Sequence, residues 1–219
     1  MQSDLVDKLL QTPNAFLLIQ QAQAILNQEQ QQRESFYNDI TEQEKVEFIN
    51  GEIIVHSPVK KKLNEASSLL NHLMDLFVRK HKLGFVGYEK VMIRLTRNDY
   101  EPDVVFFRKE KSIHFSPNQT LFPVPDLVVE ILSDGTEYKD RGIKFQDYEA
   151  HQVMEYWIID PEHQILEQYL LTDQGYELHL KSDNGYVKST AVNGFSIPIE
   201  AIFNEEVHLS TIHHLLQSA

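Results

Sequence analysis

The sequence predicts a mixed α/β fold, with a central sheet flanked by helices, a helical arm at the N-terminus and β-hairpins near the C-terminus. Three short apolar runs are typical of buried strands: "PDVVFF" (102–107), "PDLVVEIL" (125–132) and "MEYWIID" (154–160). A helical pattern at 136–151 separates the last two runs, and a helix between two strands predicts a parallel crossover. Short alternating runs at 165–199, split by Asp-Gln-Gly and Asp-Asn-Gly, predict antiparallel hairpins.

Residues 1–40 form a predicted helical arm ahead of a domain at 41–219. The stretch "QQAQAILNQEQQQRES" is rich in glutamine, a residue that favours helices. Apolar residues recur at helical spacing at Phe16, Ile19, Ala22 and Ile25 or Leu26. This spacing favours an amphipathic helix, and a role of the arm in dimerisation is the sharper hypothesis.

The segments between the arm and the apolar runs carry recognisable start and turn signals. Thr41 followed by Glu44 is a capping-box pattern, which predicts a short helix from Thr41. Asn50-Gly51 between two apolar runs predicts a tight hairpin, because both turn positions need positive φ. An apolar stripe at helical spacing predicts a helix at 59–82. Two further elements are expected: a strand or hairpin at 84–95 and a closing helix at 210–218.

Composition and charge exclude several classes of protein. The 219 residues include no cysteine, which excludes disulfides, thiolate zinc sites and cysteine nucleophiles. The ten histidines show no HExxH spacing, which argues against a zinc enzyme. No apolar run approaches the ~18 residues of a membrane helix, and the N-terminus lacks a secretory pattern, so we expect a cytoplasmic protein without a membrane partner. The formal charge of −13 argues against a general DNA binder, although salt screening over ~8 Å leaves room for a local basic cleft.

Glu130 lies inside the apolar run 125–132 and needs a partner for its charge. Side chains alternate faces along a strand, so Glu130 is expected to point where Val128 and Leu132 point. An unpaired carboxylate there costs several kcal/mol or raises its own pKa. Asp103, which opens the preceding apolar run in the same way as Asp126 opens this one, could share a Mg²⁺ ion with Glu130. A metal-bound water could then attack a phosphodiester, with a nearby lysine neutralising the developing charge.

The order aspartate, glutamate, lysine resembles the PD-(D/E)XK nuclease superfamily. The superfamily lysine lies two residues after the glutamate, where this chain has Leu132, and Lys144 in "DRGIKFQDYE" is the replacement. The wider pattern resembles the Uma-type family of restriction-like endonucleases, long labelled a domain of unknown function. The matching stretches span roughly Glu42 to Leu171: "VEFINGEIIVHSP", "EPDVVFF" and "PDLVVEILSDGTEYKDRGIKFQDYEAHQVMEYWIIDPE", with the hairpin that follows. The last long stretch is the specific one.

The resemblance implies a restriction-endonuclease-like fold, a site and a reaction. Glu47, Asp103, Glu130 and Lys144 would be the catalytic residues. Asp103 and Glu130 would be direct metal ligands, Glu47 would help to hold the metal or its bound water, and the Ile131 carbonyl could add a ligand. The cofactor implied by the resemblance is Mg²⁺, with Mn²⁺ as a substitute. The substrate would be DNA, and the chain would be a homodimer by analogy with restriction-fold nucleases.

The chain departs from the family pattern at three places. Val46 stands where tyrosine is frequent, "VKKKLNE" (59–65) stands where His-Gln is frequent, and "LSDGT" (132–136) stands where "LSPST" is frequent. These departures leave the acids and the lysine intact. They therefore bear on substrate contacts more than on metal binding.

Simpler interpretations exist for each of these residues. Glu130 could be a buried acid hydrogen-bonded to a tyrosine or arginine, and Lys144 could be a solvated helix lysine at ion-pair spacing from Asp140 and Asp147. Lys139, Arg141 and the "KKK" at 60–62 could contact phosphate or could be a solvated surface. Trp157 is expected in the core and His213-His214 at the surface.

Three functions remain open on the sequence. The first is a metal-dependent endonuclease that hydrolyses DNA. The second is a catalytically weak or inactive binding or regulatory protein on the same fold. The third is a structural partner that assembles through the glutamine-rich arm.

Overall fold

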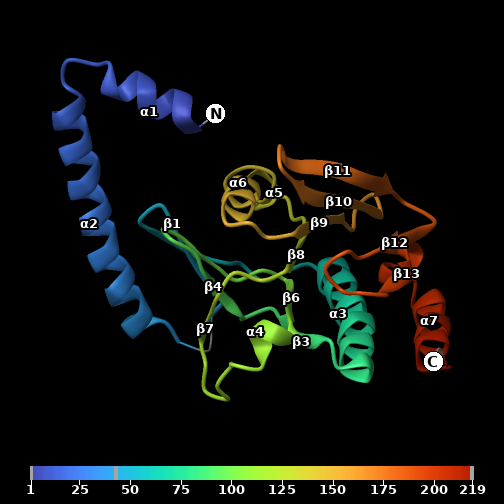
Figure 1. Cartoon of the computed structure of the whole chain (residues 1–219). Coiled ribbons are helices and arrows are strands. Elements are labelled where there is room, and N and C mark those ends of the chain that lie inside the picture. Colours follow the sequence, from blue (N-terminus) through green and yellow to red (C-terminus); the bar gives the residue numbers. More distant parts are fainter. Residues whose placement is uncertain (1, 42–43, 218–219) are drawn as a thin grey trace.

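A six-stranded mixed sheet forms the centre of the molecule (Figure 1). In the computed structural model, which describes residues 2–41 and 44–217, the strand order is β11-β10-β9-β8-β6-β3. β8 and β9 are parallel, whereas the other neighbouring pairs are antiparallel. The parallel pair confirms the predicted crossover. The strands are β3 Gly84–Tyr88, β6 Val104–Arg108, β8 Leu127–Ile131, β9 Glu155–Asp160, β10 Ile165–Thr172 and β11 Gly175–Ser182.

A second, five-stranded sheet packs against the first and has the order β2-β1-β5-β4-β7. Asn50 and Gly51 have φ values of 51° and 84°, and they join β1 to β2 in the predicted hairpin. A strand or hairpin was expected at 84–95; the segment contains two strands, β3 and β4, but they form no hairpin because they lie in different sheets. Glu89, with φ of 54°, turns the chain between them. The strands are β1 Val46–Ile49, β2 Glu52–Val55, β4 Met92–Arg94, β5 Asp99–Tyr100 and β7 Leu121–Phe122.

Successive side chains of β6 point to opposite faces of the central sheet and enter two separate hydrophobic cores. Val104 and Phe106 point to the face covered by the long helix α3 (Lys61–His81), which confirms the helix expected at 59–82. Val105 and Phe107 point to the opposite face, towards the second sheet. Every one of these four side chains is at most 1% exposed, so the six-stranded sheet is the middle layer of the molecule.

The C-terminal part of the chain completes the layer that contains α3. The hairpins expected at 165–199 are present, but the second one pairs β12 (Tyr186–Lys188) with β13 (Ser196–Pro198) in a sheet of its own. A 3-10 helix, Ile199–Ile202, leads into α7 (Glu205–Gln217). α7 begins five residues before the expected start, because Asn204 accepts hydrogen bonds from the backbone N–H groups of Glu206 and Val207 and caps the helix.

The predicted helix at 136–151 is two short helices, α5 (Glu137–Asp140) and α6 (Ile143–Ala150). The break falls at Gly142, whose φ of −113° and ψ of −100° lie outside the helical region. α6 lies over the same face of the central sheet as the second sheet does (Figure 1). The short helix expected from Thr41 includes residues 42 and 43, which lie outside the described residues; Glu44 and Lys45 are not helical.

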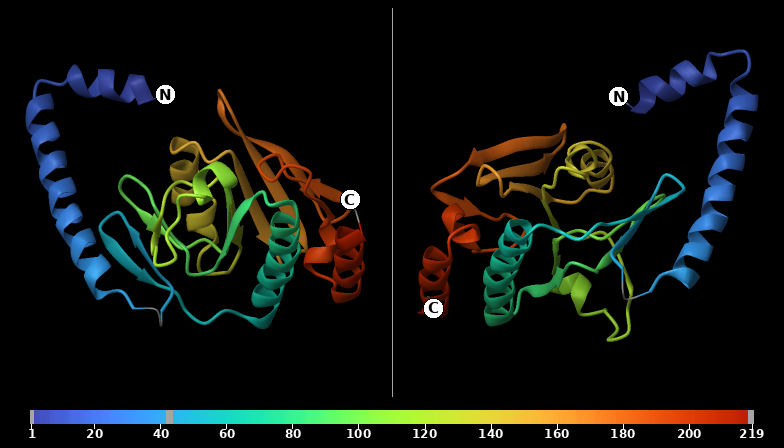
Figure 2. Two further views of the ribbon diagram at one scale, coloured as in Figure 1. Left: turned by 60° about the horizontal axis from the view of Figure 1, so that its bottom comes forward. Right: turned by 180° about the vertical axis from the view of Figure 1, so that it is seen from behind.

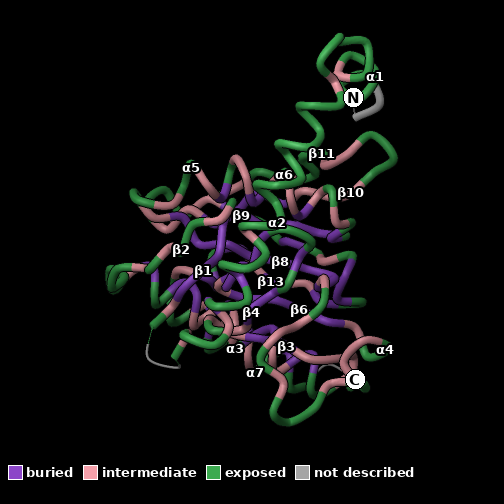
Figure 3. Tube along the Cα trace, turned by 90° about the vertical axis from the view of Figure 1, so that its left-hand side faces the viewer, coloured by how far each residue is buried: buried purple, intermediate pink, exposed green. Residues whose placement is uncertain are grey.

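The N-terminal arm is helical, as predicted, and its last third packs on the domain. It consists of α1 (Gln2–Leu10) and α2 (Ala15–Asp39), which stand away from the sheets in both views of Figure 2. Phe36 is 1% exposed and packs on Phe48 of β1, and the buried Arg33 donates two hydrogen bonds of 2.6 Å to Asp99 of β5. The rest of α2 and α1 is largely exposed (Figure 3).

Two smaller predictions concern Trp157 and the pair His213-His214. Trp157 is 0% exposed and belongs to the core, and both His213 and His214 are exposed, as expected. α4 (Lys109–Ser112) adds one turn after β6. None of the helices within residues 2–41 and 44–217 combines the length and apolarity that a membrane crossing requires.

Candidate active site

Glu130 points to the face predicted for it. Val128 and Leu132 pack in the core between the two sheets, and Glu130, between them on β8, projects to the same side. Its Oε1 accepts hydrogen bonds from Lys144 Nζ at 3.1 Å and from Tyr148 Oη at 3.0 Å. One of the simpler interpretations of Glu130 was a buried acid hydrogen-bonded to a tyrosine. The structure contains this hydrogen bond, from Tyr148, together with the contact to Lys144.

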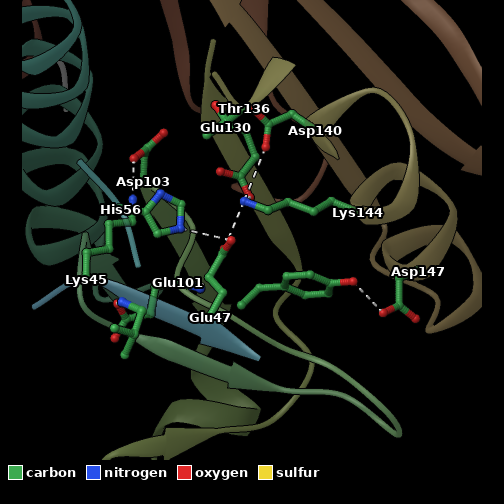
Figure 4. Close-up of polar contacts among 12 residues, drawn as sticks. Lys45, Glu47, His56, Glu101, Asp103, Glu130, Thr136, Asp140, Lys144 and Asp147 are labelled. Carbon is green, nitrogen blue, oxygen red and sulfur yellow. Dashed lines mark hydrogen bonds and ion pairs between the residues drawn. The ribbon is translucent and has the colours of Figure 1, made fainter. Parts of the chain in front are cut away.

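Lys144 extends from α6 into a group of three acids (Figure 4). Its Nζ lies 2.9 Å from Glu47 Oε1 and 3.2 Å from Asp140 Oδ1, in addition to its contact with Glu130. The residue is 2% exposed, so the interpretation of Lys144 as a solvated helix lysine is wrong. The pairing with Asp147 expected from its spacing is also absent, because Asp147 instead accepts hydrogen bonds from Tyr100 and Asn98.

Glu47 reaches this group from the hairpin β1–β2. Its neighbours Val46 and Phe48 point outwards to the arm, so Glu47 points inwards to the central sheet. Oε1 also accepts a hydrogen bond from the Glu101 backbone N–H at 3.1 Å, and Oε2 lies 3.0 Å from His56 Nε2. The side chain is completely buried behind Lys144.

Asp103 lies beside the lysine-centred group but is held by other partners. It immediately precedes β6, and its Oδ2 accepts a hydrogen bond of 2.7 Å from the backbone N–H of Ile131. Its Oδ1 accepts one of 2.7 Å from Lys45 Nζ. The structure therefore brings Glu47, Glu130 and Lys144 into direct contact and fixes Asp103 to the strand that carries Glu130.

These side chains lie at a cleft of about 740 Å³ between the hairpin, α3 and the loop that follows β8. Asp103, Glu130, Asp140 and Lys144 line it, whereas Glu47 does not reach it. Basic groups also line it, among them Lys45, His56, Lys60, Lys62 and Lys139. Lys60 and Lys62 pair with the acids Asp134 and Glu162, respectively, which line the cleft too.

Two of the basic residues that could contact phosphate on the sequence alone point elsewhere. Arg141 forms a two-point ion pair with Glu167 of β10, at 2.7 and 3.1 Å, and lies outside the cleft lining. Lys61 pairs with Glu65 one turn along α3 and is also outside the lining. The remaining candidates for phosphate contact are Lys60, Lys62 and Lys139.

The acids of the group differ in how readily they hold a negative charge. Burial raises the pKa of Glu130 well above its usual value, and the neighbouring acids add to this rise against the opposing effect of Lys144. Burial acts in the same direction on Glu47, but Lys144 and His56 outweigh it and lower the pKa of Glu47 to about 2. Burial alone would lower the pKa of Lys144, yet the surrounding carboxylates raise it well above the usual value. Lys144 is therefore charged, and Glu130 is the acid that gains most from a further cation.

The residues suit Mg²⁺ by their chemistry. Asp103 and Glu130 present carboxylate oxygens to the cleft, and Mg²⁺ is commonly held by one or two protein carboxylates with the rest water or phosphate. Two buried acid oxygens nearby, Glu47 Oε2 and Asp140 Oδ1, accept no hydrogen bond, although each faces a nitrogen within 3.2 Å. Among the described residues no group of three or more His, Asp or Glu side chains is arranged to hold a metal ion. Ammonium groups lie among the acids instead, so metal binding would move Lys144 or Lys45.

Three residues at the site were not singled out from the sequence: Lys45, His56 and Tyr148. Asp140 was expected only as an ion-pair partner of Lys144, and that pair is present. The Asn50-Gly51 turn fixes a register in which Glu47 is opposite Ile54, so Lys45 and His56 follow on the same face at a spacing of two. The hairpin register could therefore have placed Lys45 and His56 beside Glu47 from the sequence. Tyr148 is one helical turn after Lys144, and it too could have been placed from the spacing.

The fold and the acidic cleft define a mixed α/β protein of the restriction-endonuclease-like class. Residues 28–200 match the model of the Uma2 family, described as "Putative restriction endonuclease", and the chain belongs to this family. The family supports a nuclease-like function. No curated protein matches the chain.

A solved structure supports the same fold. It is described as "a putative nuclease belonging to DUF820 from Anabaena variabilis ATCC 29413". The two structures superpose with a TM-score of 0.62 at 19% sequence identity, over 76% of this chain and 90% of the other. At this identity the likeness establishes the fold alone.

Proposed function

We propose that this chain is a metal-dependent endonuclease that hydrolyses phosphodiester bonds in DNA. The observation that carries the proposal is the buried Lys144 ammonium group, held by three carboxylates at a cleft that Asp103 also lines. A buried charge group of this kind is costly to maintain for stability alone, and perturbed acids in a cleft are typical of catalytic sites. Membership of the Uma2 family supports the same reaction.

The described residues suit distinct roles in that reaction. Asp103 and Glu130 would hold Mg²⁺, or Mn²⁺ in its place, with the Ile131 carbonyl as a further predicted ligand. When bound, the ion lowers the pKa of an attacking water and screens negative charge in the transition state. Lys144 neutralises the charge that develops on the phosphate and orients the water.

Glu47 and Asp140 act through Lys144. Glu47 is completely buried and does not reach the cleft, so its contact of 2.9 Å positions the ammonium group. The direct role at the metal that the family resemblance implies for Glu47 would require Lys144 to move. Lys60, Lys62 and Lys139 line the cleft and suit contacts with the DNA phosphates.

Nicking of supercoiled plasmid in Mg²⁺ tests the proposal. We expect the wild-type chain to cleave, EDTA to stop cleavage, and Asp103→Asn, Glu130→Gln or Lys144→Met to reduce the rate by at least about 100-fold, as expected for groups that stabilise developing charge. Glu137→Gln is the matched control, because Glu137 lines the same cleft but pairs with Arg141. Equal rates for Glu130→Gln and the control would contradict the assigned site.

The formal charge of −13 favours one alternative, a nuclease-fold protein with weak or no catalysis that binds or regulates. Metal titration with thermal melting separates the two functions. Both predict that Mg²⁺ raises the melting temperature and that Glu130→Ala removes the rise. Metal stabilisation without cleavage of plasmid, linear or single-stranded DNA supports the alternative and rejects the nuclease.

A further inference from the structure

The exposed part of the N-terminal arm carries an apolar stripe with an internal symmetry. We call the five residues Leu18, Ile19, Ala22, Ile25 and Leu26 the arm stripe; they read "LIxxAxxIL". Measured from Ala22, the leucines lie four residues away on either side and the isoleucines three residues away. These offsets place all five on one face of α2, because residues three and four apart are helix neighbours.

The arm stripe continues the face through which α2 docks on its own domain. From Ala22 the spacing runs four, three, four and three residues through Leu26, Glu29, Arg33 and Phe36. Arg33 and Phe36 are buried against the second sheet, and Glu29 pairs with Arg97. In contrast, Leu18, Ile19, Ile25 and Leu26 are 38%, 43%, 56% and 42% exposed. This face of α2 therefore packs on the domain in the last third of the helix. At the arm stripe, the same face is not covered by any of the described residues.

Charge indicates what covers the arm stripe. The chain has a net charge of −13, yet no charged residue occurs between Lys8 and Glu29. The stripe therefore has no charges with which to select an oppositely charged partner. The absence of Lys and Arg also argues against a membrane surface, because helices that lie in an interface are rich in both.

A second copy of the chain is a partner that requires neither charges on the stripe nor a membrane surface. The arm projects from the body, and residues 15–28 extend for about 20 Å at 1.5 Å per residue, which exceeds a screening length of ~8 Å. Two copies can therefore meet through their arms without bringing their acidic bodies together. A two-fold contact uses the same patch on both copies, so it needs a self-complementary surface.

We propose that the chain forms a homodimer through its arms, with two α2 helices packed antiparallel across a two-fold axis at Ala22. In this arrangement Leu18 and Ile19 of one copy face Leu26 and Ile25 of the other. The small Ala22 side chain at the crossing lets the helices approach to the 8–10 Å typical of packed helices. The proposal is independent of catalysis, and it places the dimer contact outside residues 28–200 that match the family.

Light scattering over a concentration series tests the dimer. We expect the full chain to approach the mass of two copies, and Leu18→Glu with Ile25→Glu to remain at the mass of one. The matched control is Leu17→Glu with Ala24→Glu, a pair with the same spacing on the opposite face of the exposed helix, which should keep the dimer. Circular dichroism and thermal melting confirm that both variants are folded.

Cysteine cross-linking tests the antiparallel register, because the chain contains no cysteine of its own. Under oxidising conditions Ala22→Cys should form an interchain disulfide and Ala24→Cys should not, since a disulfide needs Cβ atoms about 4 Å apart. A mixture of Leu18→Cys and Leu26→Cys chains should form the mixed disulfide in preference to either homodimer. A monomeric wild-type chain, a dimer that survives the stripe variant, or preferred Leu18–Leu18 cross-links would overturn the proposal.

Discussion

Lys144 makes it possible for the acids at the cleft to remain buried together. Glu47 and Glu130 come from different sheets and Asp140 from α5, and each lies within 3.2 Å of the lysine Nζ. At such distances in a poorly solvated site, like charges repel strongly unless a cation lies between them. The lysine is therefore the counterion of these acids, and in the proposed reaction it is also the group that would neutralise a phosphate.

Replacing Lys144 with methionine should strongly destabilise the fold. Loss of the ammonium group leaves three buried acids without the cation that they share, which costs about 3–5 kcal/mol of unfolding free energy. Urea denaturation measures this cost, with Lys139→Met as the control because Lys139 lines the same cleft and is only partly buried. Adding Glu130→Gln to Lys144→Met should recover part of the loss. A single variant as stable as the control would show that the acids do not depend on the lysine.

Glu167 should make stability depend on acidic pH. Burial tends to raise its pKa, but hydrogen bonds from Arg141, Tyr169 and Lys181 outweigh this and lower the pKa to about 2. Because the folded pKa lies below the unfolded value of about 4.3, the contribution is complete above that value and is lost as the pH falls towards 2.

The corresponding test compares Glu167→Gln with wild type by urea denaturation across the acidic range. Arg141 is one-third exposed, so we expect a loss of only about 1–2 kcal/mol at neutral pH. The gap between the two proteins should shrink as the pH falls from about 5 to about 2. A gap that stays constant over this range would show that Glu167 does not titrate between these limits.

At the level of elements, local signals in the sequence predicted most of the structure. The Asn50-Gly51 turn, the apolar runs of β6, β8 and β9 and the helical stripe of α3 are each encoded within a few residues, and all are confirmed. The break between α5 and α6 was missed because Gly142 is tolerated within a helical pattern at a cost of only ~1 kcal/mol. The sheet change between β3 and β4 was missed because it depends on pairing with distant strands.

The break at Gly142 should be intolerant of any side chain. A Cβ atom at this position would lie 2.6 Å from the Tyr138 carbonyl oxygen, which is backbone and cannot move freely. We expect Gly142→Ala to cost about 1–3 kcal/mol of unfolding free energy, as overpacking does elsewhere. Gly135→Ala in the preceding loop is the control, because a Cβ there meets nothing within 4 Å. Equal melting temperatures for the two variants would remove the steric explanation.

At the level of the whole molecule, the site exists only because two sheets pack face to face. Lys45, Glu47 and His56 come from the β1–β2 hairpin of the second sheet and its flanking residues. Glu130 belongs to the central sheet, and Lys144 belongs to α6, which covers that sheet. The family resemblance predicted Glu130 and Lys144 together, with the lysine on the helix that follows the strand of Glu130. The sequence could not show that Lys45 pairs with Asp103, since these residues are 58 positions apart.

The arm should contribute to the stability of the whole domain through Arg33. Its guanidinium group lies in a buried pair with Asp99 and also donates to the carbonyls of Leu95 and Thr96. Arg33→Met leaves the Asp99 carboxylate with Tyr37 as its side-chain donor among the described residues, so we expect a loss of about 3–5 kcal/mol in urea denaturation. Arg97→Met removes a more exposed pair with Glu29 and should cost at most about 1 kcal/mol. Similar losses for both would contradict this role of the buried pair.

Diffraction from crystals soaked in Mn²⁺ tests the central claim most directly, because anomalous scattering locates the ion without any assay of activity. The proposed site predicts one peak within about 2.2 Å of carboxylate oxygens of both Asp103 and Glu130, with Lys144 or Lys45 displaced, and no peak there in Glu130→Gln crystals. Wild-type crystals with Mn²⁺ bound only elsewhere, and with both lysines still on their acids, would contradict it.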